Sequence, residues 1–417
     1  MMMTENAKSV SEVARLLQQS IRPFERCEEI SLKSATGRIC AENIDSPMAL
    51  PARNNAAVDG FAFHYDWAIS NPEFIYNVVA EIRAGHPFDE PVLQGQAVAI
   101  FTGAIVPDGL DCIVMQENCI IESENRVKIA TIAKQGLNIR KAGENLSKGE
   151  QIIRKGGRIS SAEIGQLSAI GKSKISCYLG ISVGVLSTGD EVVDASDTSS
   201  NNILNVGQLY DTNRPMLCSL ICQDNHLCSD YGIVIDDKSS LQRAYEKALV
   251  NNDVVISSGG ASQGIEDHTQ EVLAALGFEV IFWRIAMKPG RPMAVGKRGN
   301  KLIICLPGNP VATFVCYRLI VAPLLDRLQS GSVRHPLRIA LPALFRHNKS
   351  ANRAEYLRAK LVRGDDGRTY IDLHGRKGAG VISSLTGADG LVEIPNKNSG
   401  VEPGMMLDFL PFMERCL

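Results

Sequence analysis

The sequence predicts a multidomain protein in which a central α/β domain is combined with β-rich domains. Three observations support this class. From about residue 181 the chain alternates apolar strands, glycine turns and helices, whereas residues 78–132 and 338–409 hold short β-prone runs, and helical patterns flank the first of these β-rich regions. At 417 residues the chain is long enough for about three domains with large apolar cores.

Two helical segments flank the first β-rich region. Residues Ser9–Ile21 place their apolar side chains on one stripe, and Ser9 and Glu12 have capping-box spacing. Residues Ser160–Ile170 follow the pair Gly156-Gly157 and begin with serines that suit a first helical turn. The pattern predicts a β-rich domain inserted into a helical one.

Short strands dominate both β-rich regions. Glycine, proline, aspartate and asparagine separate the runs of the first region, which are Val78–Ile82, Gln96–Ile100, Cys112–Gln116 and Arg126–Ile132. The runs of the second region are Arg338–Leu341, Tyr356–Val362, Tyr370–Leu373, Leu391–Ile394 and Met406–Phe409. The second set predicts a C-terminal β-barrel or sandwich.

The middle of the chain repeats one unit three times. Apolar strands at Val183–Leu186, Asp253–Ile256 and Leu302–Cys305 each run into a glycine turn. Helical patterns lie between and after them, at Pro215–Cys222, Leu241–Leu249, Thr269–Leu276 and from Val311 onward. Repetition of buried strand, turn and helix predicts βαβ units on a parallel sheet.

Composition excludes several function classes. The net charge is -2, from 44 Lys and Arg against 46 Asp and Glu, which argues against nucleic acid or an anionic membrane as partner. Apolar runs such as Leu319–Leu325 fall short of the ~20 residues of a membrane helix, and no secretory signal precedes the first helix. We therefore expect a cytoplasmic protein. Cys218, Cys222 and Cys228 fit no common zinc spacing, so we expect reduced, metal-free thiols.

Glycine turns after the three central strands predict an anion-binding edge. The turns are Ser187-Thr188-Gly189-Asp190-Glu191, Ser257–Gly264 and Pro307-Gly308-Asn309-Pro310. In a parallel sheet, ligands bind beyond the carboxyl ends of the strands, where backbone N–H groups and helix N-termini face a phosphate. In the third turn Asn309 is expected to cap the following helix, with Pro310 at its first position.

Acidic and basic residues stand beside these turns. The acids, which predict either a Mg²⁺ site or helix caps, are Asp190, Glu191, Asp211, Asp236, Asp237, Glu266 and Asp267. Lys288-Pro289-Gly290-Arg291-Pro292 presents two cations on a stiff backbone, as an oxyanion site would. Together the residues predict nucleotide-phosphate chemistry without naming the substrate.

At this point the motifs match a known family. The chain resembles the MoeA family of molybdopterin molybdenumtransferases, which is related to the E-domain of gephyrin. The matching motifs, in chain order, are Pro51, Asn55–Ala62, Thr102–Ala104, Pro107, Gly109, Asp111, Gly143–Asn145, Ser187–Glu191, Asp211–Asn213, Ser257–Asp267, Lys288–Pro292 and Leu306–Ala312. They span nearly the whole chain.

The resemblance implies a specific activity. Such a protein takes adenylylated molybdopterin and molybdate, hydrolyses the phosphoanhydride in a Mg²⁺-dependent step, releases AMP and leaves molybdenum on the dithiolene. A molybdopterin adenylyltransferase is then an expected partner. The resemblance also implies an elongated homodimer whose active site lies between the third domain of one subunit and the β-domain and barrel of the other.

Four domains follow from the same resemblance. They are a split helical domain at 1–46 and 147–177, an inserted β-rich domain at 47–146, a three-layer α/β domain at 178–328 that resembles the small molybdopterin adenylyltransferase MogA, and a C-terminal β-barrel at 329–417.

The resemblance also assigns residues to roles. Glu191, Asp236 and Asp267 are expected as metal ligands and catalytic acids, joined in catalysis by Asp59, Thr102 and Lys288. The expected substrate-binding residues are Ser187, Gly189, Asp190, Ser258, Gly259, Gly260, Ser262, Gly264, Arg284, Arg291, Pro307, Gly308, Asn309 and Arg358.

Some positions depart from the family pattern. An amide, Asn145, stands where a carboxylate is usual, Asn54-Asn55-Ala56 replaces Asp-Asn-Ser, Arg284 replaces a lysine, and Ala379 replaces a serine. These changes keep two alternatives open: an impaired paralogue that binds molybdopterin or acts as a scaffold, and a nucleotide pyrophosphatase of the CinA type.

Overall fold

The structure, a computed structural model, describes residues 7–130, 134–196, 204–259, 265–333, 335–350 and 353–412, with the backbone alone for 265–267. The chain forms two compact units. Unit 1 comprises Met1–Glu28 and Cys177–Leu417, and unit 2 comprises Glu29–Ser176. Within these described ranges no helix is both long and apolar enough to cross a bilayer.

A six-stranded sheet forms the centre of unit 1. Its order is β16 (Leu227–Val234), β13 (Ser182–Thr188), β17 (Val254–Ser258), β21 (Lys301–Leu306), β20 (Ala294–Arg298) and β18 (Glu279–Phe282). The first four strands are parallel, as predicted. The sequence patterns did not reveal β20 and β18. The tight turn at Gly299-Asn300 joins β20 to β21 as an antiparallel pair, and β18 then pairs antiparallel with β20.

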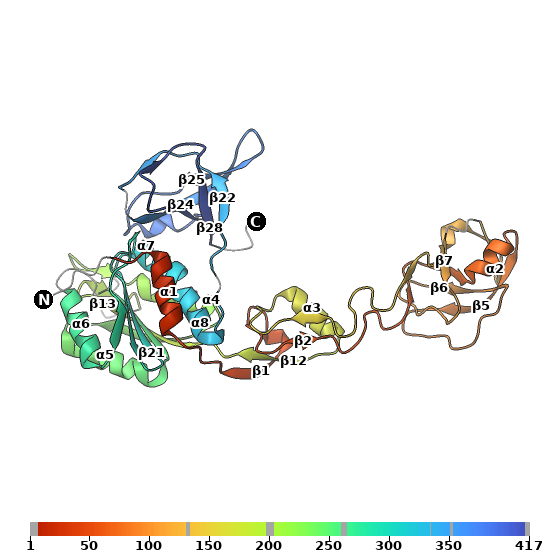
Figure 1. Cartoon of the computed structure of the whole chain (residues 1–417), viewed down its shortest axis with the longest axis horizontal. Helices are drawn as coiled ribbons and strands as arrows, with labels where there is room; N and C mark the ends of the chain where they lie inside the picture. The colour runs from red at the N-terminus through yellow and green to blue at the C-terminus, as the bar shows by residue number, and fades with distance from the viewer. Residues whose placement is uncertain are drawn as a thin grey trace. The chain divides into compact units, whose positions relative to one another are not determined.

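Helices cover both faces of this sheet and give the predicted three layers (Figure 1). One face carries α1 (Val10–Ser20), α4 (Asn213–Gln223), α7 (Pro310–Cys316) and α8 (Ala322–Ser330), with the π-helical turn η4 (Tyr317–Val321) between the last two. The other face carries α5 (Lys238–Asn251) and α6 (Ile265–Ala275). Each face encloses its own apolar cluster, since neighbouring strand residues such as Val255 and Ile256 point to opposite sides.

The first helix belongs to this core. Its capping box forms as predicted, with Ser9 N donating to Glu12 Oε2 at 2.7 Å. Val13 and Leu17 are buried among the central strands and η4. The segment that the resemblance assigned to a split helical domain therefore packs on the α/β sheet of unit 1.

The C-terminal strands form the predicted barrel. Its main sheet has the order β19 (Met287–Lys288), β24 (Ala354–Arg363), β26 (Gly390–Ile394), β28 (Met406–Pro411) and β22 (Ile339–Pro342), while β25 (Thr369–Leu373) pairs with the far half of β24. A bridge from Ala343 to Ile371 closes the ring. The short pair β23 (His347–Asn348) and β27 (Gly400–Val401) and the 3-10 turn η5 (Ile382–Ser384) complete it. β19 pairs with β24 of the barrel, and the next strand along the chain, β20, belongs to the central sheet. The barrel and the central domain are therefore joined by a strand as well as by the chain connection.

Unit 2 contains the predicted β-rich domain. Its sheet runs β7 (Cys112–Met115), β4 (Gly60–Phe63), β6 (Gln96–Ile100), β5 (Ile75–Ile82), β9 (Arg126–Ile129) and β8 (Cys119–Ser123), with α2 (Tyr65–Ser70), η2 (Gln116–Asn118) and the pair β3 (Asn55–Ala56) and β10 (Ile139–Arg140) beside it. The remainder of unit 2 is not mainly helical: it holds α3 (Ser161–Ala169) and η1 (Leu32–Ser34) beside β2 (Ile44–Asp45) and β11 (Gln151–Ile153). Strands β1 (Cys27–Ser31) and β12 (Lys174–Tyr178) pair where the chain passes between the units.

Candidate functional site

The carboxyl ends of β13, β17 and β21 lie side by side in unit 1. Gly259 closes the tip of β17 at φ +99°, and a Cβ added there would lie 2.2 Å from the carbonyl oxygen of Thr188 at the tip of β13. On the other side of Gly259 lies Gly308, at the tip of β21. A Cβ added to Gly308 would lie 3.7 Å from the Gly259 Cα. Only glycine permits this approach of Gly259 to Thr188, so the turn sequence brings backbone groups together as an anion site requires.

Asn213, in the first turn of α4, holds two of these tips. Its Nδ2 donates to Ser258 Oγ at 2.7 Å and to the Gly308 carbonyl at 2.6 Å, and the side chain is buried. Ser258 Oγ in turn donates to the Pro307 carbonyl at 3.3 Å. These bonds fix the distance between the turns that follow β17 and β21.

Several polar atoms at these tips are buried and have no protein partner within the described ranges. They are Ser187 Oγ, Thr188 Oγ1 and Asn213 Oδ1. Buried polar atoms in native structures are normally hydrogen-bonded, so these three mark the place where a polar ligand or water completes the site.

Carboxylates gather beside the first tip. The backbone N–H of Asp236 donates to Asp190 Oδ1 at 3.2 Å. Burial, followed by the negative charges of Asp190 and Glu191, raises the pKa of Asp236. Such mutual repulsion is relieved by a hard cation, and oxygen ligands are those that Mg²⁺ prefers. The described side chains form no complete group of three metal-binding His, Cys, Asp or Glu residues.

Two acids of the predicted cluster have another role. Asp237 caps α5 through its Oδ1, which accepts from the N–H groups of Ser239 and Ser240 at 2.9 Å each. Hydrogen bonds from the side chains of Ser240 and Ser239, supported by the N–H of Ser240, hold the pKa of Asp237 far below its usual range. Asp211 Oδ1 likewise accepts from the first N–H groups of α4, and its Oδ2 pairs with the buried Arg214. Both therefore serve as helix caps, the other outcome that the sequence left open.

A cationic cavity of about 140 Å³ lies between the barrel and the 288–289 turn. Lys288, Arg358 and Lys377 line it, together with His347 and His374. Arg358 is buried, and its guanidinium donates to Ser384 Oγ at 2.9 Å and to the Arg376 carbonyl at 3.0 Å. Burial lowers the pKa of Arg358, a shift that binding of an anion would offset.

A buried carboxylate positions the lysine of this cavity. Glu355 Oε1 lies 3.1 Å from Lys288 Nζ, and its Oε2 lies 2.9 Å from His347 Nε2. Burial acts to raise the pKa of Glu355, but the hydrogen bonds from His347 and Lys288 outweigh it and the pKa is lowered. Glu355 thus stays ionised and holds Lys288 at the rim.

The cationic cavity adjoins the third strand tip. The N–H of Val311, in the first turn of α7, donates to the carbonyl of Ala379 at 3.0 Å, and Ala379 lines the cavity. The turn after β21 therefore has the glycine tips on one side and the cationic cavity on the other. One ligand with a phosphate and a second, smaller anion could be held next to each other here.

Other predicted residues are placed more loosely. Asn309 occupies the N-cap of α7, but its side chain makes no capping hydrogen bond, which corrects the prediction; Pro310 does occupy the first turn. Arg291 is exposed and does not line the cavity, and neither does the half-buried Arg284. Proximity of these two arginines to the anion site stays a prediction.

Asp59 and Thr102 meet in unit 2. Asp59 Oδ1 accepts from both the N–H and the hydroxyl of Thr102 at 2.7 Å each. The backbone hydrogen bond, supported by the hydroxyl, lowers the pKa of the exposed Asp59. The predicted pair is thus assembled as an ionised carboxylate with a fixed orientation.

Five predicted residues lie outside what the structure describes: Gly260, Ser262 and Gly264, and the side chains of Glu266 and Asp267.

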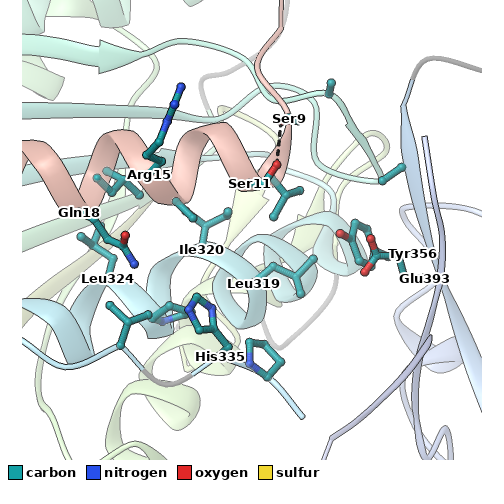
Figure 2. Close-up of a pocket in the computed structure, with 18 of the residues that line it drawn as sticks. Ser9, Ser11, Arg15, Gln18, Leu319, Ile320, Leu324, His335, Tyr356 and Glu393 are labelled. Atoms are coloured by element: carbon teal, nitrogen blue, oxygen red, sulfur yellow. Dashed lines mark hydrogen bonds between the residues drawn. The ribbon is translucent and has the colours of Figure 1, made fainter. Parts of the chain in front are cut away.

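A second, larger cavity of about 680 Å³ occupies another part of unit 1. Figure 2 shows Ile320 and Leu324 below α1, with Tyr356 and Glu393 of the barrel at one end. None of the described residues that line it was predicted for the site. The wall of this cavity is largely apolar, so the larger of the two cavities is not the candidate active site.

Sequence reasoning missed several residues of the site. Asn213 was quoted within a family motif, yet its clamping role depends on three segments meeting. Glu355 and His347 gave no local signal, since Glu355 stands in a strand that carries other charged residues and His347 in a short loop-like segment. Lys377 and His374 come from a barrel loop whose position no local pattern predicts.

Comparison with known proteins agrees with this arrangement. Residues 8–171 match the family model described as the MoeA N-terminal region (domain I and II), residues 184–327 a probable molybdopterin binding domain, and residues 340–412 the MoeA C-terminal region (domain IV). The molybdopterin molybdenumtransferase of Haemophilus influenzae is 31% identical over 400 residues, which cover 96% of this chain and 97% of the relative. That of Nostoc sp. is 35% identical over 307 residues, 72% of this chain and 69% of the relative.

Solved structures give the same result. The crystal structure of a molybdopterin biosynthesis MoeA protein from Pyrococcus horikoshii covers 98% of this chain and all of its own, with 30% identity and a TM-score of 0.79. A second structure of such a protein from P. horikoshii OT3, at 26% identity, gives a TM-score of 0.82 with the same coverage. Family models, full-length relatives and full-length structures agree, and the chain belongs to the MoeA family.

Proposed function

We propose that this protein acts in molybdenum cofactor biosynthesis as a molybdopterin molybdenumtransferase. It would take adenylylated molybdopterin and molybdate, cleave the phosphoanhydride and release AMP. The relatives that match nearly the whole chain carry this activity in their names. The observation that carries the proposal is the contact of Val311 N with Ala379 O, which joins the glycine tips to the cationic cavity.

The cationic cavity suits molybdate. At about 140 Å³ it is smaller than the roughly 300–1,000 Å³ of pockets that hold drug-sized ligands, so a small inorganic anion fits better than a nucleotide. Lys288, Arg358 and Lys377 supply the positive charge that a tetrahedral dianion requires. The glycine tips next to it would hold the phosphates through backbone N–H groups.

Mg²⁺ is the expected cofactor. Glu191 and Asp236 would hold it with Asp190 close by, and Asp267 is the further ligand predicted from the family resemblance. In support, burial together with the negative charges of Asp190 and Glu191 raises the pKa of Asp236. When bound, the ion would neutralise phosphate oxygens during anhydride cleavage. The backbone N–H groups of the glycine tips would hold the phosphates in one orientation.

We also propose that the active form is a homodimer in which each copy supplies Asp59 and Thr102 to the other. In support, this pair is exposed and its carboxylate is already oriented. The test mixes two inactive variants, Asp59→Asn and Glu191→Gln. Random exchange should restore about a quarter of wild-type activity, because half of the dimers then hold one intact site. Restoration should be absent if each copy works alone.

The main experiment measures AMP release from adenylylated molybdopterin by the purified full chain. We expect release to require both molybdate and Mg²⁺. AMP release at the same rate with and without molybdate would favour a CinA-type pyrophosphatase. A molybdopterin adenylyltransferase would then supply the substrate, and co-purification with that enzyme tests it as a partner.

One observation favours a second candidate, an impaired paralogue that binds molybdopterin without efficient turnover. Ala379 lines the cationic cavity with a methyl group where the family pattern has a serine hydroxyl, and Asn145 replaces a carboxylate. Complementation of a strain that lacks its molybdenumtransferase compares wild type with Asn145→Asp and Ala379→Ser. Rescue by these variants alone would select the second candidate.

A further inference from the structure

The imidazole of His347 belongs to the wall of the cationic cavity and is 8% exposed. Its Nε2 lies 2.9 Å from Oε2 of the buried Glu355. The other oxygen of this carboxylate accepts from Lys288 Nζ at 3.1 Å. An ionised carboxylate can only accept hydrogen bonds, so the contact with Glu355 fixes a proton on Nε2 of His347.

The other ring nitrogen of His347 lacks a partner. Nδ1 is buried and makes no hydrogen bond to any of the described residues. With a proton on Nε2, the neutral ring has a lone pair on Nδ1, whereas the charged ring would have an N–H there. A buried N–H without an acceptor is costly, and Lys288 and Arg358 already bring positive charge to the cavity. As long as no anion is bound, these contacts favour neutral His347.

A dianion in this cavity would reverse that balance. Beside His347, Lys288 and Arg358 carry two positive charges and Glu355 carries one negative charge, which leaves one net positive charge. Lys377 is exposed, so water screens its charge. A bound dianion would change the local total to one net negative charge, and a proton on His347 would return that total to zero. A bound dianion therefore favours the charged imidazolium.

A second histidine, His374, also lines the cavity but differs in its contacts. Its Nε2 lies 3.0 Å from the Thr386 carbonyl, not from a carboxylate, and its ring is less buried than that of His347. A carboxylate stabilises an imidazolium more than a carbonyl does, and burial strengthens the interaction. His347 should therefore respond to the anion more strongly than His374.

The other charged side chains near His347 belong to types that ordinarily titrate far from neutral pH. On β23, on the segments that flank it and on the cavity loop they are Arg346, Lys349, Arg353, Arg376, Lys377 and Glu402. Arg346 is paired with Glu402 at 2.7 Å, and Lys349 Nζ donates to the Asn398 carbonyl at 2.7 Å. A change of charge near neutral pH in this region thus belongs to a histidine.

We infer that binding of an oxyanion dianion in the cationic cavity is coupled to the uptake of a proton by Nδ1 of His347. The proton comes from the solvent, Glu355 keeps the proton on Nε2, and no other bond forms or breaks. The inference rests on the proposed function, because molybdate is the dianion that the cavity is proposed to hold. His347 would then help the site to distinguish a dianion from a monoanion of the same shape.

Calorimetric titration of the full chain with molybdate tests the inference. At about pH 7.5, titrations in buffers with different heats of ionisation give the number of protons taken up on binding. We expect uptake that approaches about one proton per molybdate bound. Because the proton is taken up on binding, molybdate affinity should fall as pH rises, by up to about tenfold per pH unit.

Perrhenate is a tetrahedral anion like molybdate, but it carries a single charge. A monoanion already balances the net charge of Lys288, Arg358 and Glu355, so no proton on His347 is needed. We expect perrhenate to bind with little proton uptake. Equal uptake with perrhenate and molybdate would contradict the charge balance from which the inference follows.

Glutamine variants assign the proton. His347→Gln can keep a donor to Glu355 but cannot titrate, so it should bind molybdate without uptake and with an affinity that does not depend on pH in this range. His86→Gln, at an exposed position of unit 2, is the matched control and should take up the proton as the wild type does. His374→Gln should also keep the uptake. This variant decides the matter if His347→Gln does not fold, since His347 is then the one described lining residue of a type that titrates near neutral pH.

Three results would overturn the inference while leaving the proposed function intact. They are molybdate binding without proton uptake, full uptake in His347→Gln, and loss of uptake in His374→Gln. Failure of molybdate to bind the wild type at all would count against the proposed function itself, and the inference would fall with it.

Discussion

The carboxylate cluster at the tip of β13 and the cationic cavity of the barrel are built on opposite principles. Around the first, burial, followed by the negative charges of Asp190 and Glu191, raises the pKa of Asp236. In the second, Lys288 and Arg358 are held by a buried carboxylate, a serine and backbone carbonyls. The first region is poised to gain from a cation and the second from an anion. We propose that this difference lets one protein hold a metal ion in the first region and an oxyanion in the second, because each region leaves part of its local charge uncompensated.

The largest expected effect comes from neutralising the carboxylate cluster. Glu191→Gln removes one expected Mg²⁺ ligand and should reduce Mg²⁺-dependent AMP release by about a hundredfold or more, equivalent to roughly 3 kcal/mol. Steady-state rates over a Mg²⁺ titration measure this. Glu246→Gln on the exposed side of α5 is the matched control, and equal rates for both variants would remove Glu191 from the metal site.

The cationic cavity should respond to a different variable. Arg358→Met should weaken molybdate binding by about a hundredfold and Lys288→Met by about tenfold, because a buried charged hydrogen-bond donor contributes more than one half-exposed. Calorimetric titration with molybdate measures both. Lys360→Met, at an exposed position of β24, should bind as wild type does; unchanged binding in Arg358→Met would contradict the assignment of the cavity.

Asn213, which clamps the turns after β17 and β21, should have an intermediate effect on nucleotide affinity. Asn213→Asp keeps the shape but loses both donors to Ser258 Oγ and the Gly308 carbonyl. We expect AMP affinity to fall by about tenfold. Titration with AMP measures this, with Asn251→Asp at the exposed end of α5 as control. If the affinity is unchanged, the clamp does not set the separation of the turns.

A pH series distinguishes the two regions again. Because the pKa of Asp236 is raised by burial and by neighbouring carboxylates, protons should compete with Mg²⁺, and Mg²⁺ affinity should fall as pH is lowered through that raised pKa. The same shift has a stability consequence. The protonated form stabilises the fold, and this contribution is lost as pH rises through the folded-state pKa. Asp236→Asn should therefore leave the melting temperature unchanged or raised at neutral pH while Mg²⁺ binding weakens. A melting temperature that falls would contradict this account.

The smallest effect tests a region outside both sites. Ser9→Ala removes the side-chain acceptor of the α1 capping box and should lower the free energy of unfolding by about 1 kcal/mol. Denaturant unfolding of unit 1 measures the loss, and AMP release at a temperature well below the transition should not change. A large loss of turnover would mean that α1 is coupled to the strand tips.

Local patterns predicted most of the fold. The helix over Ser9–Ile21 appears as Val10–Ser20, and the run Gln96–Ile100 appears unchanged as β6, because periodicity and capping residues act within a few residues of one another. The strands β18 and β20 escaped prediction, since they depend on a hairpin that folds back onto β21. The part expected as a split helical domain holds the predicted helix α3 and also short strand pairs, which carry little periodic signal in the sequence.

The functional site divides in the same way. Glycine turns, acids and cations were visible in the chain, and the family resemblance assigned them roles. Which acids cap helices was not visible: Asp211 and Asp237 accept from the first N–H groups of a helix, whereas Asp190 accepts from the N–H of Asp236.

The sequence by itself determined the order of domains, the glycines at the strand tips and the types of charge in each segment. These follow from backbone freedom, side-chain periodicity and composition, which are properties of neighbouring residues. Only the tertiary structure decided that Asn213 joins two tips, that Glu355 holds Lys288, and that Val311 meets Ala379. Each of these contacts joins segments far apart in the chain, so its existence depends on packing that no local pattern records.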